Sequence, residues 1–322
     1  MKKIETVVVG TDFSPCAQAG LDAVRRAAAV LGTRRVHVVN VVETSSWVSP
    51  PLVAYAELIE LALDAARQRL EGLGFAIEGV EVTHEARIGS PARELAKAAE
   101  EIGAGLIVSA THGRTGLTRA VLGSVAADLV RVAHVPVLVI PSETQIPERF
   151  GRVLAAIDLS PVSRLVLEAA FQWAALSGDA RLRVLSMFEH PIATLGDGEL
   201  LPHYPSKEEI EEMGSEVRSR VDRLIREVGN PGVAVDVEVL SKGPAARVVL
   251  DVAGLTEPDL VVLGTSGKNA WQRMIVGSTA GRVLSECARP VLIVPHDVRE
   301  EVLDEDVVPG VSNRLRTAQG TT

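Results

Sequence analysis

The sequence predicts an α/β fold built from two consecutive doubly wound parallel sheets of five strands each. Short apolar runs that suit buried strands alternate with helical patterns of ten or more residues. The order of motifs in the first half of the chain then begins again in the second half. Such alternation implies right-handed βαβ crossovers with helices on both faces of each sheet, and 322 residues are enough for two domains.

The first half reads as five strands joined by four helices. Its strands are short, rich in β-branched residues and bounded by turn residues, as is typical of strands buried on both faces. Ser14 as N-cap and Pro15 at the first helical position predict the start of the first helix. The predicted strands are residues 4–10, 35–42, 80–87, 106–110 and 136–141, and the predicted helices are residues 15–31, a long helix ending near 72, residues 92–102 and a helix opened by Gly123.

The second half repeats this order with one insertion. The sequence Asp158-Leu-Ser-Pro repeats Asp12-Phe-Ser-Pro at an offset of 146 residues, whereas Pro290 matches Pro136 at an offset of 154. The offset has already grown just after strand three, where Gly243-Pro-Ala matches Ser90-Pro-Ala. The eight extra residues must therefore lie between the second and third strands. We expect them in the proline-rich segment 191–205.

The expected domains are residues 1–145 and 148–297, followed by a disordered tail at residues 298–322. The tail is acidic and then rich in small polar residues. Each domain ends in an apolar strand, 137–140 or 291–294, whose open edge must be paired or covered. We expect these two strands to pair with each other, which makes the chain an internal pseudo-dimer; a homo-dimer through the same strands is the alternative.

Composition narrows the class of protein. The net charge of −9 has both signs interspersed, so no basic face predicts binding to nucleic acid or to an anionic membrane. No apolar run reaches membrane-spanning length and no signal-peptide core follows the N-terminus, so we expect a cytoplasmic protein. Cys16 and Cys287 read as isolated packing residues, and no histidine or cysteine cluster has metal-site spacing.

The predicted site lies at the carboxyl ends of two strands in each half. If the strand order is 3-2-1-4-5, the chain reverses direction between strands one and four, where ligands of such sheets bind. Asp12 or Asp158 ends strand one, and a glycine-containing loop leaves strand four. In the second half this loop runs from 263 to 279; its glycines and the following helix N-terminus suit a phosphate, although glycines also occur in ordinary structural loops.

These residues resemble the universal stress protein family in its tandem form. Nucleotide-binding members carry G-x2-G-x9-G-[S/T], and the second half matches it completely. In the first half Ala110 replaces the first glycine, so we expect a methyl group that crowds a phosphate or forbids a required φ. The matching residues are Gly264, Gly267, Gly277 and Ser278 in the second half and Gly113, Gly123 and Ser124 in the first.

The resemblance implies an adenine-nucleotide alpha-hydrolase-like fold with ATP bound mainly by the second half. It places Asp12 and Asp158 near the adenine and Val41 and Met187 against the base, while the hydroxyls of Ser278 and Thr279 would serve phosphate or Mg²⁺. Each has a structural alternative: the aspartates as turn formers, Val41 and Met187 as ordinary core, and the hydroxyls as helix caps.

Three functions remain open on the sequence. The first is an ATP-binding regulator of the stress response whose loop surface changes with bound nucleotide. The second is an enzyme, for which we expect at most slow ATP hydrolysis, because the chain lacks G-x4-G-K-[ST], G-x-S-x-G and the motifs of related nucleotidyl-transfer enzymes. The third is a dimerisation scaffold that binds no nucleotide. We expect about one nucleotide per chain.

Overall fold

A computed structural model of the chain describes residues 4–43, 52–111, 123–141, 144, 146–147, 149–175, 180–188, 193–194, 200–201, 206–241, 243–265 and 277–296. Twelve strands and eight helices occur in these ranges. In the first half they are β1 (Thr6–Gly10), α1 (Pro15–Leu31), β2 (Arg35–Val42), α2 (Leu52–Glu71), β3 (Glu81–Ile88), α3 (Pro91–Glu101), β4 (Leu106–Ala110), α4 (Ser124–Val132) and β5 (Val137–Ile140).

The second half repeats the order and adds one short hairpin. Its elements are β6 (Arg152–Ile157), α5 (Val162–Ala174), β7 (Arg181–Met187), β8 (Ala193–Thr194), β9 (Leu200–Leu201), α6 (Lys207–Val228), β10 (Ala234–Leu240), α7 (Ala245–Thr256), β11 (Leu260–Gly264), α8 (Ser278–Glu286) and β12 (Val291–Val294). The β8–β9 hairpin lies between β7 and α6, the region in which we expected the insertion.

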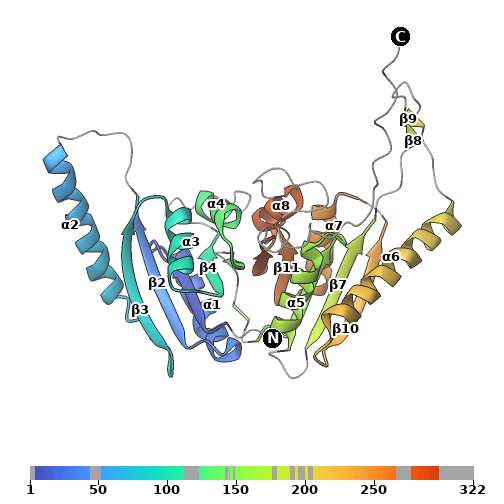
Figure 1. The fold of residues 1–322 in the computed structure, drawn as a ribbon, viewed down its shortest axis with the longest axis horizontal. Coiled ribbons are helices and arrows are strands. Elements are labelled where there is room, and N and C mark those ends of the chain that lie inside the picture. The colour runs from blue at the N-terminus through green and yellow to red at the C-terminus, as the bar shows by residue number, and fades with distance from the viewer. Residues whose placement is uncertain are drawn as a thin grey trace, which may run out of the picture.

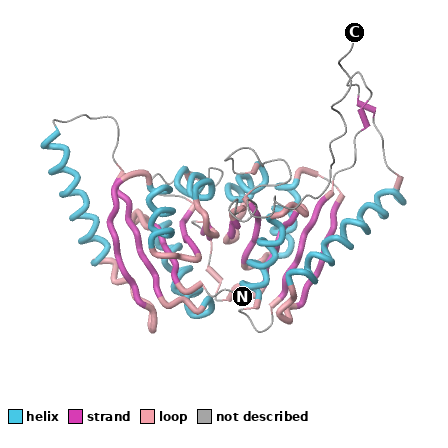
Figure 2. The backbone as a smooth tube through the Cα atoms, viewed as in Figure 1, coloured by secondary structure: helices cyan, strands magenta, loops and turns pink. Residues whose placement is uncertain are grey.

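Ten of the strands form one continuous sheet in the order β10-β7-β6-β11-β12-β5-β4-β1-β2-β3. Within each half the order is the predicted 3-2-1-4-5, and all pairs are parallel. Figure 2 shows the two fans of strands meeting in the middle of the molecule, and in Figure 1 helices α2 and α6 lie at its opposite ends. The α/β fold with two doubly wound halves is confirmed.

The two halves join through their last strands. β12 pairs antiparallel with β5, with Leu292 opposite Leu138 in the centre of the ladder. The internal pseudo-dimer is therefore confirmed. Because β5 also pairs with β4 and β12 with β11, both edges of each terminal strand are occupied. A homo-dimer through these strands would have to break this pairing.

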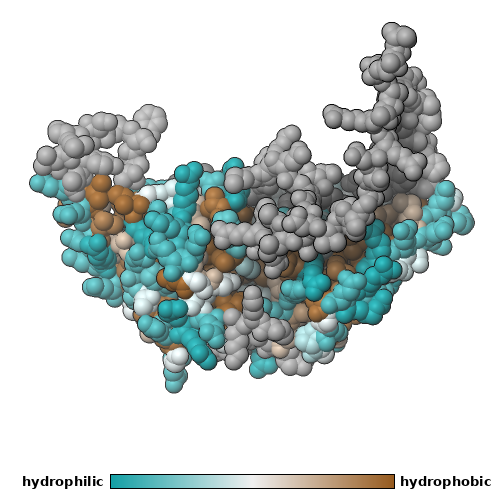
Figure 3. All heavy atoms as spheres, in the orientation of Figure 1, coloured by the Kyte–Doolittle hydropathy of each residue, from teal (hydrophilic) through white to brown (hydrophobic). Residues whose placement is uncertain are grey.

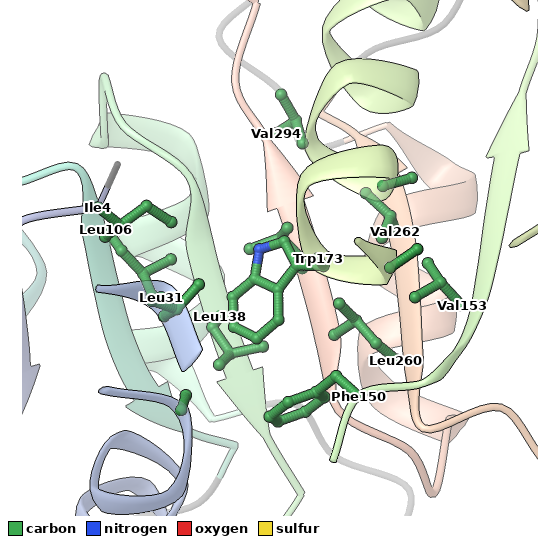
Figure 4. Close-up of a cluster of buried hydrophobic side chains, with 14 of the residues drawn as sticks. Ile4, Leu31, Leu106, Leu138, Phe150, Val153, Trp173, Leu260, Val262 and Val294 are labelled. Carbon is green, nitrogen blue, oxygen red and sulfur yellow. The ribbon is translucent and has the colours of Figure 1, made fainter. Parts of the chain in front are cut away.

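Two hydrophobic clusters, one on each face of the sheet, run across this junction. One receives side chains from α1, α2, α5 and α6, and the other from α3, α4, α7 and α8. Trp173 of α5 is 1% exposed and packs edge-on against Phe150, with ring centroids 4.9 Å apart. Figure 4 shows Trp173 between Leu138 of the first half and Leu260 of the second, so both halves share one core.

The ends of several helices follow from local chemistry. The Ser14 hydroxyl accepts a hydrogen bond from the backbone N–H of Ala17, as its predicted role as N-cap requires. Ser206 and Glu209 form a reciprocal capping box at the start of α6. No helix within the described ranges is long and apolar enough to cross a membrane.

Candidate functional site

The carboxyl ends of β6 and β11 bring two distant stretches of the second half together. These strands are adjacent and parallel, with Ala155 opposite Val262, and they end at Ile157 and Gly264. Asp158 and the loop after Gly264 therefore leave the sheet at the same edge. This edge is the switch point of a doubly wound sheet, where crossover connections leave in opposite directions.

The neighbouring strand adds Met187 to the same edge. Ile157 pairs with Ser186 in β7, so Asp158 and Met187 each directly follow a paired residue. In the first half Gly10 pairs with Val39, which places Val41 slightly further along β2 than the end of β1. The topology thus places the predicted strand-one and strand-two residues at one edge in both halves.

Asp12 and Asp158 form the same tight turn in the two halves. Oδ1 of Asp12 accepts a hydrogen bond of 3.0 Å from the backbone N–H of Ser14, and Oδ1 of Asp158 accepts one of 3.0 Å from that of Ser160. An aspartate that binds the N–H two residues later is a turn former. Both aspartates therefore act as turn formers in this structure, and this role is compatible with an additional contact to a ligand.

The residue after each aspartate has a left-handed backbone. Phe13 has φ 63° and Leu159 has φ 61°. A residue with a Cβ pays roughly 1–2 kcal/mol for this conformation, so the surrounding structure must hold both turns in place. The sequence gives no signal for it, because glycine or asparagine is the usual choice at such a position.

The first turn is held by a buried amide that sequence reasoning missed. Nδ2 of Asn40 donates a hydrogen bond of 2.7 Å to the carbonyl oxygen of Thr11, and both residues are buried. In the second half the sheet register places Ser186 at this position, fully buried, and its hydroxyl has no hydrogen-bond partner among the described residues. The two halves therefore support equivalent turns with different polar contacts.

The turns also lead into their helices differently. The Ser14 hydroxyl caps α1, whereas the Ser160 hydroxyl is buried without a partner in the described part of the chain. Ser163 instead donates a hydrogen bond of 3.2 Å to Oδ1 of Asp158. The repeated Ser-Pro pattern thus produces a side-chain cap in one half only.

Helices α4 and α8 begin next to the strand-four ends. The N–H of Gly123 donates to the carbonyl of Thr111 at 2.8 Å, and that of Gly277 to the carbonyl of Thr265 at 2.9 Å. Each loop therefore returns to the strand end from which it leaves. Gly113 and Gly267 belong to these loops and lie outside the described residues.

The N-cap of α8 is Gly277, with φ −54° and ψ 145°, and a glycine has no side chain with which to cap the helix. Ser278 and Thr279 are its first helical residues, so Ser278 is not the cap that the structural alternative requires. The same holds for Gly123 and Ser124 in α4. The first N–H groups of a helix have no intrahelical partner and carry the positive end of its dipole, which suits an anion.

Two reasons were expected for the first glycine of the motif, space for a phosphate and a φ that only glycine adopts easily, and the second reason is wrong for Gly264. Gly264 does not have a positive φ, so its backbone conformation does not require glycine.

Val41 and Met187 are partly buried and pack against the hydrophobic cluster on the α3, α4, α7 and α8 face. These contacts match ordinary core residues and leave part of each side chain exposed. Within the described ranges, no group of three or more potential ligands is placed to hold a metal ion.

Comparison with known proteins adds a family and full-length relatives. The sequence model of the Universal stress protein family matches residues 3–141 and 149–295. Universal stress protein Rv2005c of Mycobacterium tuberculosis (strain H37Rv) is 30% identical over 306 residues, covering 91% of this chain and 97% of its own length. Universal stress protein MJ0531 of Methanocaldococcus jannaschii is 40% identical over 108 residues, which cover 33% of this chain and 64% of its own.

Solved structures agree on the architecture. A universal stress protein from Archaeoglobus fulgidus superimposes with a TM-score of 0.62 at 19% identity, covering 90% of this chain and 96% of its own. A putative universal stress protein from Pseudomonas aeruginosa gives 0.61 at 21% identity, covering 91% and 93%. At these identities the similarity establishes the fold alone.

Proposed function

The chain belongs to the universal stress protein family, and from that premise we propose that it is an ATP-binding regulator whose second half carries the main nucleotide site. The proposal depends chiefly on the edge where Asp158, Met187 and the N-terminus of α8, with Gly277 as its N-cap, follow adjacent strands. Backbone N–H groups at that N-terminus would bind phosphate oxygens. The hydroxyls of Ser278 and Thr279 would bind phosphate or Mg²⁺, and Asp158 and Met187 would lie near the adenine.

The first half is proposed as the weaker site. It has the same turn at Asp12 and the same glycine N-cap at Gly123, but Ala110 stands where the second half has Gly264. A site of reduced affinity is therefore expected there. We expect one tightly bound nucleotide per chain, and two equal sites would contradict this ranking.

Gly277→Asp tests the main site. Aspartate is a good N-cap and its backbone accepts the φ and ψ of Gly277, so we expect α8 to form normally. The new carboxylate would stand where phosphate is expected and would repel it. Titration with a fluorescent ATP analogue should show binding by the wild type and at least about a tenfold weaker Kd in the variant, a loss of roughly 1.4 kcal/mol.

Gly123→Asp is the matched comparison in the first half, because Gly123 has nearly the same backbone conformation, φ −58° and ψ 141°. We expect it to retain the tight site. Equal affinity of Gly277→Asp and wild type would remove the site assignment. Absence of binding in folded wild-type protein would favour the scaffold, and turnover above background with a defined product would favour an enzyme.

A further inference from the structure

We propose that the exposed face of α2 is a self-association surface, on which a second copy of this chain packs its own α2 antiparallel. The face is defined by Leu58, Leu61 and Ala65, and we call it the α2 seam. Leu58 is 56% exposed and Leu61 is 66% exposed, although α2 lies against the sheet along its other side. In Figure 3 hydrophobic atoms also reach the surface beside the upper part of α2.

The spacing of the seam suits helix packing. Its residues are three and four positions apart, and Ala54 and Gln68 continue the same spacing in the sequence at either end. Alternating intervals of three and four keep side chains on one stripe of a helix, the arrangement that a second helix needs. This stripe faces away from the sheet, because Ala66 and Leu70 are the buried residues on the inner side.

The second half provides an internal comparison. Helix α6 occupies the same place at the opposite end of the sheet (Figure 1). The order of exposed and less exposed residues along α2 from 57 to 70 matches that along α6 from 208 to 221, apart from the degree of burial at one position. At the positions of the seam, α6 has Glu209, Glu212 and Glu216, all exposed. Glu209 also forms the capping box of α6, but Glu212 and Glu216 are exposed residues of the polar kind expected on a solvated helix face, whereas α2 has Leu61 and Ala65 at these positions.

The charged residues of α2 favour a second copy of this chain as the partner of the α2 seam. Among the exposed charged residues of α2, those before Ala65 are acidic, and those after it are two arginines followed by Glu71 at the helix end. A second α2 running antiparallel would place the acidic residues in the first part of one helix near the two arginines of the other, in a two-fold interface. An anionic membrane is disfavoured by the same acidic residues and by the net charge of −9. The acidic residues are Glu57, Glu60 and Asp64, and the basic ones Arg67 and Arg69.

Because β5 pairs with β12 within one chain, a dimer of intact chains needs a surface other than these two strands. The strands that could have joined two copies already pair within one chain. The outer strands β3 and β10 carry charged side chains, which discourage edge-to-edge pairing. One helix pair buries less than the roughly 1,200 Å² of stable interfaces, so we expect a weak, concentration-dependent dimer.

The test is sedimentation velocity of the full chain over a concentration series. We expect the wild type to shift from monomer to dimer, and Leu58→Glu/Leu61→Glu, which copies the residues of α6, to raise the dimer Kd at least about tenfold. Leu255→Glu is the matched control: it makes the same chemical change at a leucine of α7 that is 84% exposed, and should leave the Kd unchanged. Circular dichroism and thermal melts confirm that both variants fold.

Three results would overturn the proposal. The first is a wild type that stays monomeric into the submillimolar range. The second is a Leu58→Glu/Leu61→Glu variant that dimerises as strongly as the wild type. The third is flotation of the monomeric wild type, but not of this variant, with vesicles of phosphatidylcholine alone or with phosphatidylglycerol, which would assign the seam to a lipid surface.

Discussion

Gly264 at the end of β11 lies directly against Val162, the first residue of α5. A Cβ added to Gly264 would lie 2.7 Å from Cγ1 of Val162, closer than real Cβ contacts allow. The equivalent pair in the first half is Ala110 with Cys16. A larger residue on the strand thus accompanies a smaller one on the helix, and the missing glycine of the first half has a packing explanation independent of any ligand.

Replacement of Gly264 should lower the free energy of unfolding, and a second substitution at Val162 should restore most of it. We expect Gly264→Ala to lower the free energy of unfolding by about 1–3 kcal/mol, because the stiff β-branched Val162 cannot move aside easily. Gly264→Ala/Val162→Cys recreates the pair of the first half and should regain most of the loss in urea unfolding. A double variant no more stable than the single one would refute the packing explanation. In that case the nucleotide affinity of the double variant would show whether Gly264 is needed for ligand binding.

The shared core should make the two halves unfold together. Trp173→Ala removes the largest fully buried side chain of the described residues and should cost about 3–5 kcal/mol, whereas Trp173→Phe keeps a ring against Phe150 and should cost less. Urea unfolding followed by circular dichroism should give one transition for the wild type. Two separate transitions, with only one of them shifted by Trp173→Ala, would show that the halves are energetically independent.

Asn40 and Ser186 form a matched pair for testing buried polar groups. Asn40→Ala leaves the carbonyl of Thr11 without its buried donor and should cost about 1–3 kcal/mol. Ser186→Ala removes a buried hydroxyl that has no partner among the described residues, so it should be neutral or slightly stabilising. Equal losses in the two variants, measured by thermal melts and urea unfolding, would contradict this assignment.

The ion cluster on β3 should make stability depend on acid pH. Burial raises the pKa of Glu85, but hydrogen bonds from His37 and Arg87 and the positive charges of both outweigh burial and lower it below its usual 4.5. The unfolded chain therefore binds the proton more readily, and stability falls as pH drops below about 4.5 through the folded pKa. Arg87 also pairs with Glu94 at 3.6 Å and with Glu101.

Glu85→Gln isolates this effect. The variant keeps an oxygen acceptor but cannot ionise, so the loss of unfolding free energy between pH 5.5 and pH 4 should be smaller than in the wild type. The same change at Glu238, which pairs with Arg183 at 3.1 Å in the second half, gives a comparison. Identical pH dependence of wild type and Glu85→Gln would show that this carboxylate does not contribute.

Much of the candidate site was predictable, because its positions follow from order along the chain. Asp12 and Asp158 end strand one and Gly123 and Gly277 begin a helix in any reading of the repeat, and the strand order then places them at one edge. The positive φ of Phe13 and Leu159 was not predictable, since neither residue favours it. The contact between Asn40 and Thr11 joins residues 29 apart, and only the pairing of β1 with β2 makes them neighbours.

The sequence by itself determined the alternation of strands and helices, the repeat and the apolar strands at the end of each half, because these depend on local patterns of burial and turn chemistry. The tertiary structure decided which surfaces remain exposed and which side chains meet. Helices α2 and α6 have nearly the same pattern of burial over residues 57–70 and 208–221, and only their place against the sheet shows that Leu58 and Leu61 face solvent. Similarly, Gly264 is explained by Val162, a residue about a hundred positions away that the sheet and α5 bring into contact.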